Sequence, residues 1–252
     1  MDRPPGEDMS TRTWCLETTD RGRYCRLPAL TRLGLTHGFS CRDLGSSEAD
    51  GFLAGILGLQ QLPLARLRQQ HTSTVHDVSA ELVKTPPVGD ALVARQAGWA
   101  LRLQTADCLP LLLVDTRSGH YGVVHAGWRG TLAGVLHQTL QALHSAGSGP
   151  GSTWMAIGPG IRACCFEIGT EVVTAFRARW GERTRHWMRP GAGSRPHLDL
   201  VAANRFQAAQ AGVPAAQVLD TGLCTRCRRD LFFSYRGDGG ATGRIITLAG
   251  RP

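Results

Sequence analysis

The sequence predicts an α/β fold in which helices flank a central β core within a single layered domain. Short apolar runs bounded by turn residues recur along the chain, and such runs are typical of strands buried on both faces. Segments with helical periodicity are fewer and alternate with the expected strands. With 252 residues, of which 42% are hydrophobic and 19% charged, the chain can bury one sizeable core.

The first half of the chain predicts mainly strands. Residues 1–12 are polar and predict a disordered N-terminus, so we expect the folded domain to span 13–252. A Gly/Ser-rich loop at 45–51 precedes a segment of helical periodicity at 52–69, which Pro63 interrupts. The strands expected in this half are 23–30, 35–42, 73–83, 90–95, 100–107, 109–115 and 120–126.

The second half predicts helices alternating with strands. Residues 131–147 have the apolar pattern of an amphipathic helix, with Thr131 as its N-cap and Gly147 at its end. An Arg/Pro/Gly-rich loop is expected at 181–197. The other helices expected here are 165–181 and 198–212, and the strands are 153–158, 217–222 and 243–250.

Composition and charge predict a cytoplasmic protein with neither a membrane nor a nucleic-acid partner. No apolar run approaches the roughly eighteen residues of a membrane span, and the polar start does not resemble a secretory signal. The net charge of +8 comes from arginines spread along the chain, without an interleaved aromatic platform for bases. We therefore expect the eight cysteines to be thiols, metal ligands or nucleophiles rather than a disulfide framework.

The hairpin TADCLPLLLVDTRSGHYGVVHAGWRGT contains the strongest indication of a site. If TRSG is its turn, a two- or four-residue loop places Pro110 opposite His125, and a three-residue loop would reverse this parity. Side chains two residues apart share a face, so Cys108 becomes the diagonal neighbour of His125, with Cβ atoms about 7–8 Å apart. A zinc ion, with Zn–S about 2.3 Å and Zn–N about 2.0 Å, can bridge that separation.

An open catalytic zinc site needs a third ligand, and the chain has nine histidines. We favour His71, because it ends a polar segment just before an expected strand. Three other histidines stay open on this reasoning: His76 lies within that strand, and His137 and His144 are expected at the surface of the long helix.

The remaining cysteine and glycine motifs carry weaker signals. CTRC at 224–227 has ligand spacing, but no second Cys-x-x-Cys completes a structural zinc site. Cys164 and Cys165 are adjacent, and we expect them to be buried thiols beside a helix start. The turns HAGWRGT and IGPGIRACC could present backbone N–H groups to an anion, with Arg129 or Arg162 adding charge, or could be ordinary tight turns.

Taken together, the motifs resemble the laccase-domain family, also called the polyphenol oxidase or peptidoglycan editing factor family. The resemblance covers the chain from about residue 30 onward and implies a layered α/β/β/α fold similar to the catalytic domain of cytotoxic necrotizing factor. It implies a zinc site formed by His71, Cys108 and His125, with Ser40 and Arg42 in the same pocket. The motifs are HGFSCR, QQH, TADCLPLLL, HAGWRGT, IGPGIRACCFEIG, DLVAAN and CTRCRRDLFFSYRGDGGATGR.

The same resemblance implies a purine nucleoside phosphorylase. Its expected substrates are adenosine, inosine, guanosine and methylthioadenosine with phosphate, and adenosine deamination is the expected side activity. Arg42 and Arg129 are candidates for the phosphate subsite. Asp107 is a candidate ligand-orienting residue or general base, or it caps the turn after its strand. The expected partners are thus a nucleoside and phosphate, and the expected assembly is a monomer or homodimer.

Three other functions stay open. With Cys108 as nucleophile and His125 as base, the protein would be a hydrolase editing a peptidoglycan precursor. Copper can bind one cysteine and two histidines, which allows polyphenol oxidation in vitro, although the chain has no His-x-His pair of the multicopper kind. A non-enzymatic, metal-dependent interaction module is the third. The segments 43–51 and 236–243 depart from the family pattern and bear on substrate preference.

Overall fold

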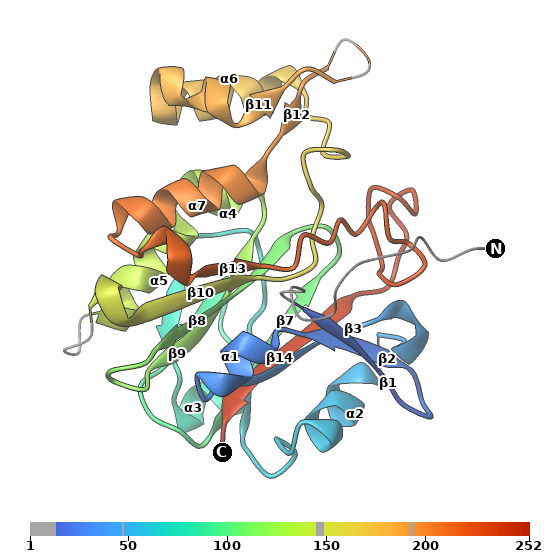
Figure 1. The fold of residues 1–252 in the computed structure, drawn as a ribbon, viewed down its shortest axis with the longest axis vertical. Coiled ribbons are helices and arrows are strands. Elements are labelled where there is room, and N and C mark those ends of the chain that lie inside the picture. The colour runs from blue at the N-terminus through green and yellow to red at the C-terminus, as the bar shows by residue number, and fades with distance from the viewer. Residues whose placement is uncertain (1–13, 47, 145–148, 192, 194) are drawn as a thin grey trace.

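Two six-stranded sheets form the β core of the protein (Figure 1). The structure is a computed structural model and describes residues 14–252 except 47, 145–148, 192 and 194. The expected disordered segment 1–12 lies outside these residues. Among the helices described, none has the length and apolar character that crossing a bilayer requires.

The first sheet contains both the first strand of the structure and the last. β14 lies between β3 and β7 and pairs antiparallel with both. Its strand order is β1 (Cys15–Thr18), β2 (Arg23–Arg26), β3 (Thr36–Ser40), β14 (Ile245–Arg251), β7 (Trp99–Thr105) and β4 (Leu64–Ala65).

The second sheet contains the hairpin of the predicted site at its centre. β8 and β9 pair antiparallel, and Pro110 lies opposite His125, so the predicted register is confirmed. Residues 116–120 connect these strands, and the Asp115 N–H donates to the His120 carbonyl, which closes the TRSG turn at 116–119. The strand order is β13 (Val218–Asp220), β10 (Thr153–Ile157), β8 (Leu109–Asp115), β9 (Tyr121–Ala126), β6 (Ala91–Ala94) and β5 (Val75–Asp77). A separate small sheet pairs β11 (Met188–Arg189) with β12 (His197–Leu198).

Helices cover the outer faces of the two sheets, which confirms the predicted α/β/β/α layering. On the second sheet, alternate side chains such as Leu111 and Val124 pack against helices, whereas Leu112 and Val123 pack toward the first sheet. On the far face of the first sheet, Ile246 packs against α2. The helices are α1 (Pro28–Arg32), α2 (Ala49–Ile56), α3 (Ala80–Lys84), α4 (Trp128–Ala133), α5 (Val135–His144), α6 (Thr170–Trp180) and α7 (Leu200–Gln210).

The helix expected over 131–147 is two helices and begins earlier. Gly127 occupies the N-cap of α4, so Thr131 is a buried residue inside that helix rather than its cap. Gly134 has a φ of +84° and ends α4, because a left-handed residue cannot continue an α-helix. The expected end at Gly147 lies outside the described residues.

Other boundaries also shifted where turn chemistry competed with the apolar pattern. The 52–69 segment is helical only to Ile56, and its end contributes β4. The 73–83 segment is a strand only in β5, and its second half belongs to helix α3. The helix begins there because the Ser79 hydroxyl accepts a hydrogen bond from Leu82 N–H and caps it. The 165–181 helix begins at Thr170, and the 181–197 loop contains a 3₁₀ helix and the β11–β12 pair.

Candidate active site and metal centre

The structure brings His71, Cys108 and His125 together at the end of the β8–β9 hairpin. Cys108 immediately precedes β8, and its Sγ lies 3.7 Å from His71 Nε2. The imidazole rings of His71 and His125 have centroids 4.8 Å apart. One possible ligand atom from each of the three residues lies within 4.8 Å of the others, so the group has the composition and spacing of a metal-binding site.

Asp90, which the sequence analysis missed, orients two of these three residues. Its buried carboxylate accepts a 2.7 Å hydrogen bond from His125 Nδ1, so the other ring nitrogen, Nε2, is the one available to Cys108 or to a metal ion. The same carboxylate accepts hydrogen bonds from the backbone N–H groups of Gln70, His71 and Thr72 and from the Thr72 hydroxyl. Asp90 therefore holds both the His71 loop and the His125 ring.

The backbone at the site adopts conformations that are unusual for residues other than glycine. His71 has a φ of +61° and Asp107 a φ of +91°, and both lie at or next to a proposed ligand. Gly127 is required for a different reason. A Cβ atom there would lie 2.7 Å from Cys108 Sγ and 2.9 Å from His71 Cδ2, closer than real contacts allow. The glycine of the HAGWRG motif therefore makes room for the ligands.

The charges of Cys108 and His125 depend on each other. Burial opposes ionisation of the Cys108 thiol, but the His125 charge and hydrogen bonds to both imidazoles outweigh it and lower the pKa of Cys108 to about 6. Burial likewise opposes protonation of His125, but the Cys108 thiolate and Asp90 outweigh it and raise the pKa of His125 to about 9. The two residues favour a thiolate–imidazolium pair, and a thiolate is the form that binds metals.

The three residues line a cavity of about 730 Å³, which we call the ligand cavity. Four arginines also line it: Arg68, Arg129, Arg236 and Arg244. None of the four forms an ion pair with a carboxylate of the described residues. The Arg129 guanidinium lies over the Trp128 ring, and Arg236 and Arg244 donate to backbone carbonyls. The cavity thus combines a metal-type cluster with unneutralised positive charge.

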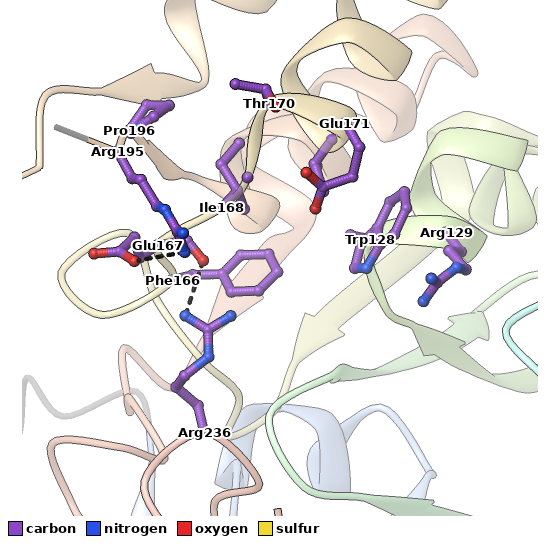
Figure 2. Close-up of a pocket in the computed structure, with 12 residues that line it drawn as sticks. Trp128, Arg129, Phe166, Glu167, Ile168, Thr170, Glu171, Arg195, Pro196 and Arg236 are labelled. Atoms are coloured by element: carbon purple, nitrogen blue, oxygen red, sulfur yellow. Dashed lines mark hydrogen bonds and ion pairs between the residues drawn. The ribbon is translucent and has the colours of Figure 1, made fainter. Parts of the chain in front are cut away.

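A second hollow of about 770 Å³ adjoins the ligand cavity and shares Trp128, Arg129, Phe166 and Arg236 with it. Figure 2 shows Trp128 and Arg129 on one side of it and Arg236 on the other, below the loop that holds Phe166. Arg236 Nη1 donates to the Glu167 carbonyl at 2.8 Å, and this places its guanidinium between the two hollows.

Ser40 and Arg42 do not line the ligand cavity, so the structure corrects their expected place in the pocket. The buried Ser40 hydroxyl accepts a hydrogen bond from Ile246 N–H inside the first sheet. Arg42 donates to the Arg229 carbonyl and to Asp238, and it packs over the Phe233 ring. Ser40 therefore supports β14, and Arg42 supports the segment 221–244 between β13 and β14, which we call the C-terminal loop.

Asp107 and Arg162 are also occupied by structural contacts. The Asp107 carboxylate lines the cavity but accepts hydrogen bonds from Thr225, Ser234 and the Arg236 N–H. Of its three expected roles, orientation of His125 belongs to Asp90, the general-base role stays a prediction, and the carboxylate binds residues 225–236 rather than capping its own turn. Arg162 forms an ion pair with Asp220 at 2.8 Å, so its charge is already neutralised.

The chain is similar to known proteins in both sequence and fold. A family model described as multi-copper polyphenol oxidoreductase laccase matches residues 43–251. Adenosine deaminase RL5, from an unknown prokaryotic organism, is 40% identical over 158 residues, which is 63% of this chain and 60% of RL5. A purine nucleoside phosphorylase of Deinococcus radiodurans is 39% identical over 204 residues, 79% of this chain and 75% of that protein.

The fold matches solved structures over nearly its whole length. The crystal structure of YlmD from Geobacillus stearothermophilus is 27% identical and has a TM-score of 0.83, covering 94% of this chain and 98% of that chain. The YfiH protein of Bacillus licheniformis is 25% identical with a TM-score of 0.84, covering 94% and 99%. The chain spans less than two thirds of RL5 but nearly all of these two solved structures.

Proposed function

The chain belongs to the multi-copper polyphenol oxidoreductase laccase family, and we propose that it is a zinc-dependent purine nucleoside phosphorylase with adenosine deaminase as a side activity. Its substrates would be adenosine, inosine, guanosine and methylthioadenosine with phosphate. Relatives named for each of these two activities support the proposal. The observation that carries it is that a three-ligand cluster lines one cavity with four arginines that form no ion pair with a carboxylate of the described residues.

The donor set fits zinc. His71, Cys108 and His125 offer two imidazole nitrogens and one thiolate, and Asp90 supports His125 as carboxylates commonly support zinc-binding histidines. Three protein ligands, rather than four, are typical of catalytic zinc sites. When bound, the ion supplies an open coordination position for water or substrate and lowers the pKa of bound water toward about 7.

The arginines supply what phosphorolysis needs. In that reaction a phosphate oxygen forms a bond to C1′ of the ribose, the bond from C1′ to the purine nitrogen breaks, and the purine takes up a proton. Arg129, Arg236 and Arg244 would bind the phosphate and hold an oxygen toward the ribose, because guanidinium groups bind phosphate through paired hydrogen bonds. Deamination replaces the amino group of adenosine by a water oxygen and does not need this subsite.

The rest of the cavity suits a purine. Its volume lies within the roughly 300–1,000 Å³ range of small-molecule sites. Tyr235, whose side chain is 56% exposed, and Phe166 contribute aromatic surface to the lining on which a base could stack. Gln69 and Gln104 line the same cavity, and Gln69 Nε2 donates to the Gln104 carbonyl. The partners that follow from the proposal are a nucleoside and phosphate.

A hydrolase acting through Cys108 is the second candidate, and one observation favours it. The thiolate–imidazolium pair of Cys108 and His125 is the arrangement of a cysteine nucleophile and its base. Its substrate would be a peptidoglycan precursor with a misincorporated amino acid. The two candidates differ in metal dependence, because a metal-bound thiolate is not free to attack.

The deciding experiment measures the zinc content of purified protein and follows products from a nucleoside panel with and without phosphate. We expect ribose-1-phosphate from adenosine only when phosphate and zinc are present. In Arg129→Gln, loss of a charge-assisted hydrogen bond of about 1.5–3 kcal/mol predicts at least a tenfold higher KM for phosphate, with deamination unchanged. Arg117→Gln, in the exposed turn of the hairpin, is the matched control. Zinc-loaded protein that forms no ribose-1-phosphate would refute the proposal.

A further inference from the structure

Four cysteines from two distant segments meet beside the ligand cavity. Cys164 and Cys165 precede α6, whereas Cys224 and Cys227 lie in the C-terminal loop, and the four sulfur atoms lie within 4.8 Å of one another. Cys165 Sγ is 3.4 Å and Cys164 Sγ is 3.6 Å from Cys227 Sγ. Cys164 and Cys165, expected as buried thiols beside a helix start, thus lie against the two cysteines of CTRC, and Cys164 is exposed rather than buried.

The backbone holds the two segments against each other. A parallel bridge joins Gly160 to Cys224, and hydrogen bonds run from Gly160 N–H to the Leu223 carbonyl and from Thr225 N–H to the Gly160 carbonyl. Each cysteine pair lies in a tight turn: Cys165 N–H donates to the Arg162 carbonyl, and Arg228 N–H donates to the Cys224 carbonyl. These turns allow adjacent and Cys-x-x-Cys thiols to point to one centre.

The spacing of the sulfur atoms is that of a tetrahedral metal site. A zinc ion with four Zn–S bonds of about 2.3 Å places its sulfur atoms about 3.8 Å apart. The two separations of 3.4 and 3.6 Å are slightly shorter than that value, and no two of the four sulfur atoms are more than 4.8 Å apart. A disulfide needs sulfur atoms about 2.05 Å apart and would use only two of the four thiols.

The surroundings of Cys224 favour a metal-binding thiolate. The backbone N–H groups of Cys227 and Arg162 are directed at the Cys224 sulfur. Backbone N–H groups directed at a sulfur atom stabilise negative charge on it, whether or not a cation is bound. Soft thiolate ligands without nitrogen or oxygen donors select zinc over harder cations.

We propose that Cys164, Cys165, Cys224 and Cys227 form a closed tetrathiolate site for a structural zinc ion, separate from the open cluster at His71, Cys108 and His125. The ion cross-links the segment before α6 to the C-terminal loop. That loop supplies Thr225, Ser234 and Arg236 to Asp107. The segment before α6 supplies Phe166, so the ion would hold two walls of the ligand cavity together.

Cobalt(II) titration of reduced, metal-free protein tests this proposal without relying on activity. Cobalt binds zinc sites, and the intensity of the thiolate-to-cobalt charge-transfer absorption increases with the number of bound thiolates. We expect the wild-type chain to bind two equivalents. The His71→Ala/Cys108→Ser variant should bind one equivalent and retain most of the charge-transfer intensity, because it keeps the four-thiolate site.

The complementary variant is Cys224→Ser/Cys227→Ser, which should bind one equivalent with the weak absorption of a single thiolate. Cys15→Ser is the matched control, because Cys15 lies outside both clusters, and it should bind two equivalents. If the double serine variant does not fold, the His71→Ala/Cys108→Ser variant alone decides. The proposal would be overturned if the wild-type chain bound one equivalent of cobalt with the charge-transfer intensity of a single thiolate. It would also be overturned if the His71→Ala/Cys108→Ser variant lost all strong charge-transfer absorption.

Discussion

Cys108 shares its cluster with two imidazoles, whereas Cys165 shares its cluster with three other thiols. The imidazoles outweigh burial and lower the pKa of Cys108 to about 6. Burial and the hydrogen bond to Cys227 raise the pKa of Cys165 to about 11. The first cluster therefore holds a thiolate before any ion arrives, and the second needs a cation to offset the charge of gathered thiolates.

The two clusters also differ in the number of ligands and in what lies around them. The His71, Cys108 and His125 cluster has three ligands and opens into a cavity lined by arginines. The four-cysteine cluster has a complete ligand set and lies between two loops. Three ligands beside a cavity suit chemistry, and four ligands between loops suit a cross-link. Position and ligand count, more than residue type, separate the two roles.

The largest expected effect is a loss of enzymatic activity when the open cluster, but not the four-cysteine cluster, is disrupted. Cys108→Ala removes the thiolate of the open cluster, so the transition state loses metal-assisted stabilisation worth several kcal/mol. We therefore expect kcat/KM for adenosine phosphorolysis to fall about 1,000-fold or more. The folded state should be retained, because Cys108 is only partly buried. Steady-state kinetics and a thermal melt check both points, with Cys15→Ala as the control. Activity within tenfold of wild type would remove the distinction between the clusters.

Asp90→Asn sharpens the comparison by weakening only one cluster. An amide cannot accept all of the hydrogen bonds that this carboxylate receives from His125 and the His71 loop, so zinc affinity of the open cluster should fall about 10–100-fold. Competition with a chromophoric chelator measures the affinity of both sites. Asp77→Asn, whose carboxylate forms an exposed ion pair with Arg95, should leave both unchanged. Equal weakening of the two sites would show that Asp90 acts on the fold alone.

Gly127→Ala tests the space around the open cluster. The new Cβ would crowd Cys108 Sγ and His71 Cδ2, and overpacking that costs about 1–3 kcal/mol predicts roughly tenfold weaker zinc binding. Gly51→Ala lies in α2 with nothing within 4 Å of the added carbon, and it should be neutral or stabilising by up to about 1 kcal/mol. If Gly127→Ala left zinc affinity unchanged, the side chains of Cys108 and His71 could shift away from the added Cβ atom without losing the ion.

The smallest expected effect on turnover comes from the four-cysteine cluster. Cys227→Ser should lower Tm by about 5–10 °C, because loss of a metal cross-link destabilises the folded state. At 25 °C, kcat/KM should fall by less than about threefold, since no cysteine of this cluster lines the ligand cavity. Calorimetry and kinetics on the same preparation check this contrast. A loss of activity as large as in Cys108→Ala would place both clusters in one catalytic unit.

Sequence reasoning succeeded where the contacts are local. The Pro110–His125 register follows from the period of two along a strand and from the length of one tight turn, and both are read within 105–131. Apolar patterns also predicted an α/β domain with helices outside a β core, whereas the α/β/β/α layering was implied by the family resemblance. Its position before an expected strand favoured His71 among nine histidines but left three others open, and the family resemblance then singled it out.

The residues that sequence reasoning missed are joined by long-range contacts. Asp90 reaches His125 because β6 pairs with β9, and no local pattern states which strand lies beside β9. An acidic residue at the start of an apolar strand was the available signal. Arg236 and Arg244 reach the cavity through a loop near the end of the chain. Ser40 and Arg42 were misplaced because a motif does not state which way its side chains face.

By itself, the sequence determined most of the longer strands, the hairpin register and the pairing of Cys108 with His125, since these depend on backbone periodicity over a few residues. Only the tertiary structure decided that Asp90 orients the site, that arginines from distant loops face the cavity, and that four cysteines meet. Those contacts arise when the sheets and loops pack, and packing depends on the summed burial of many apolar side chains rather than on any local motif.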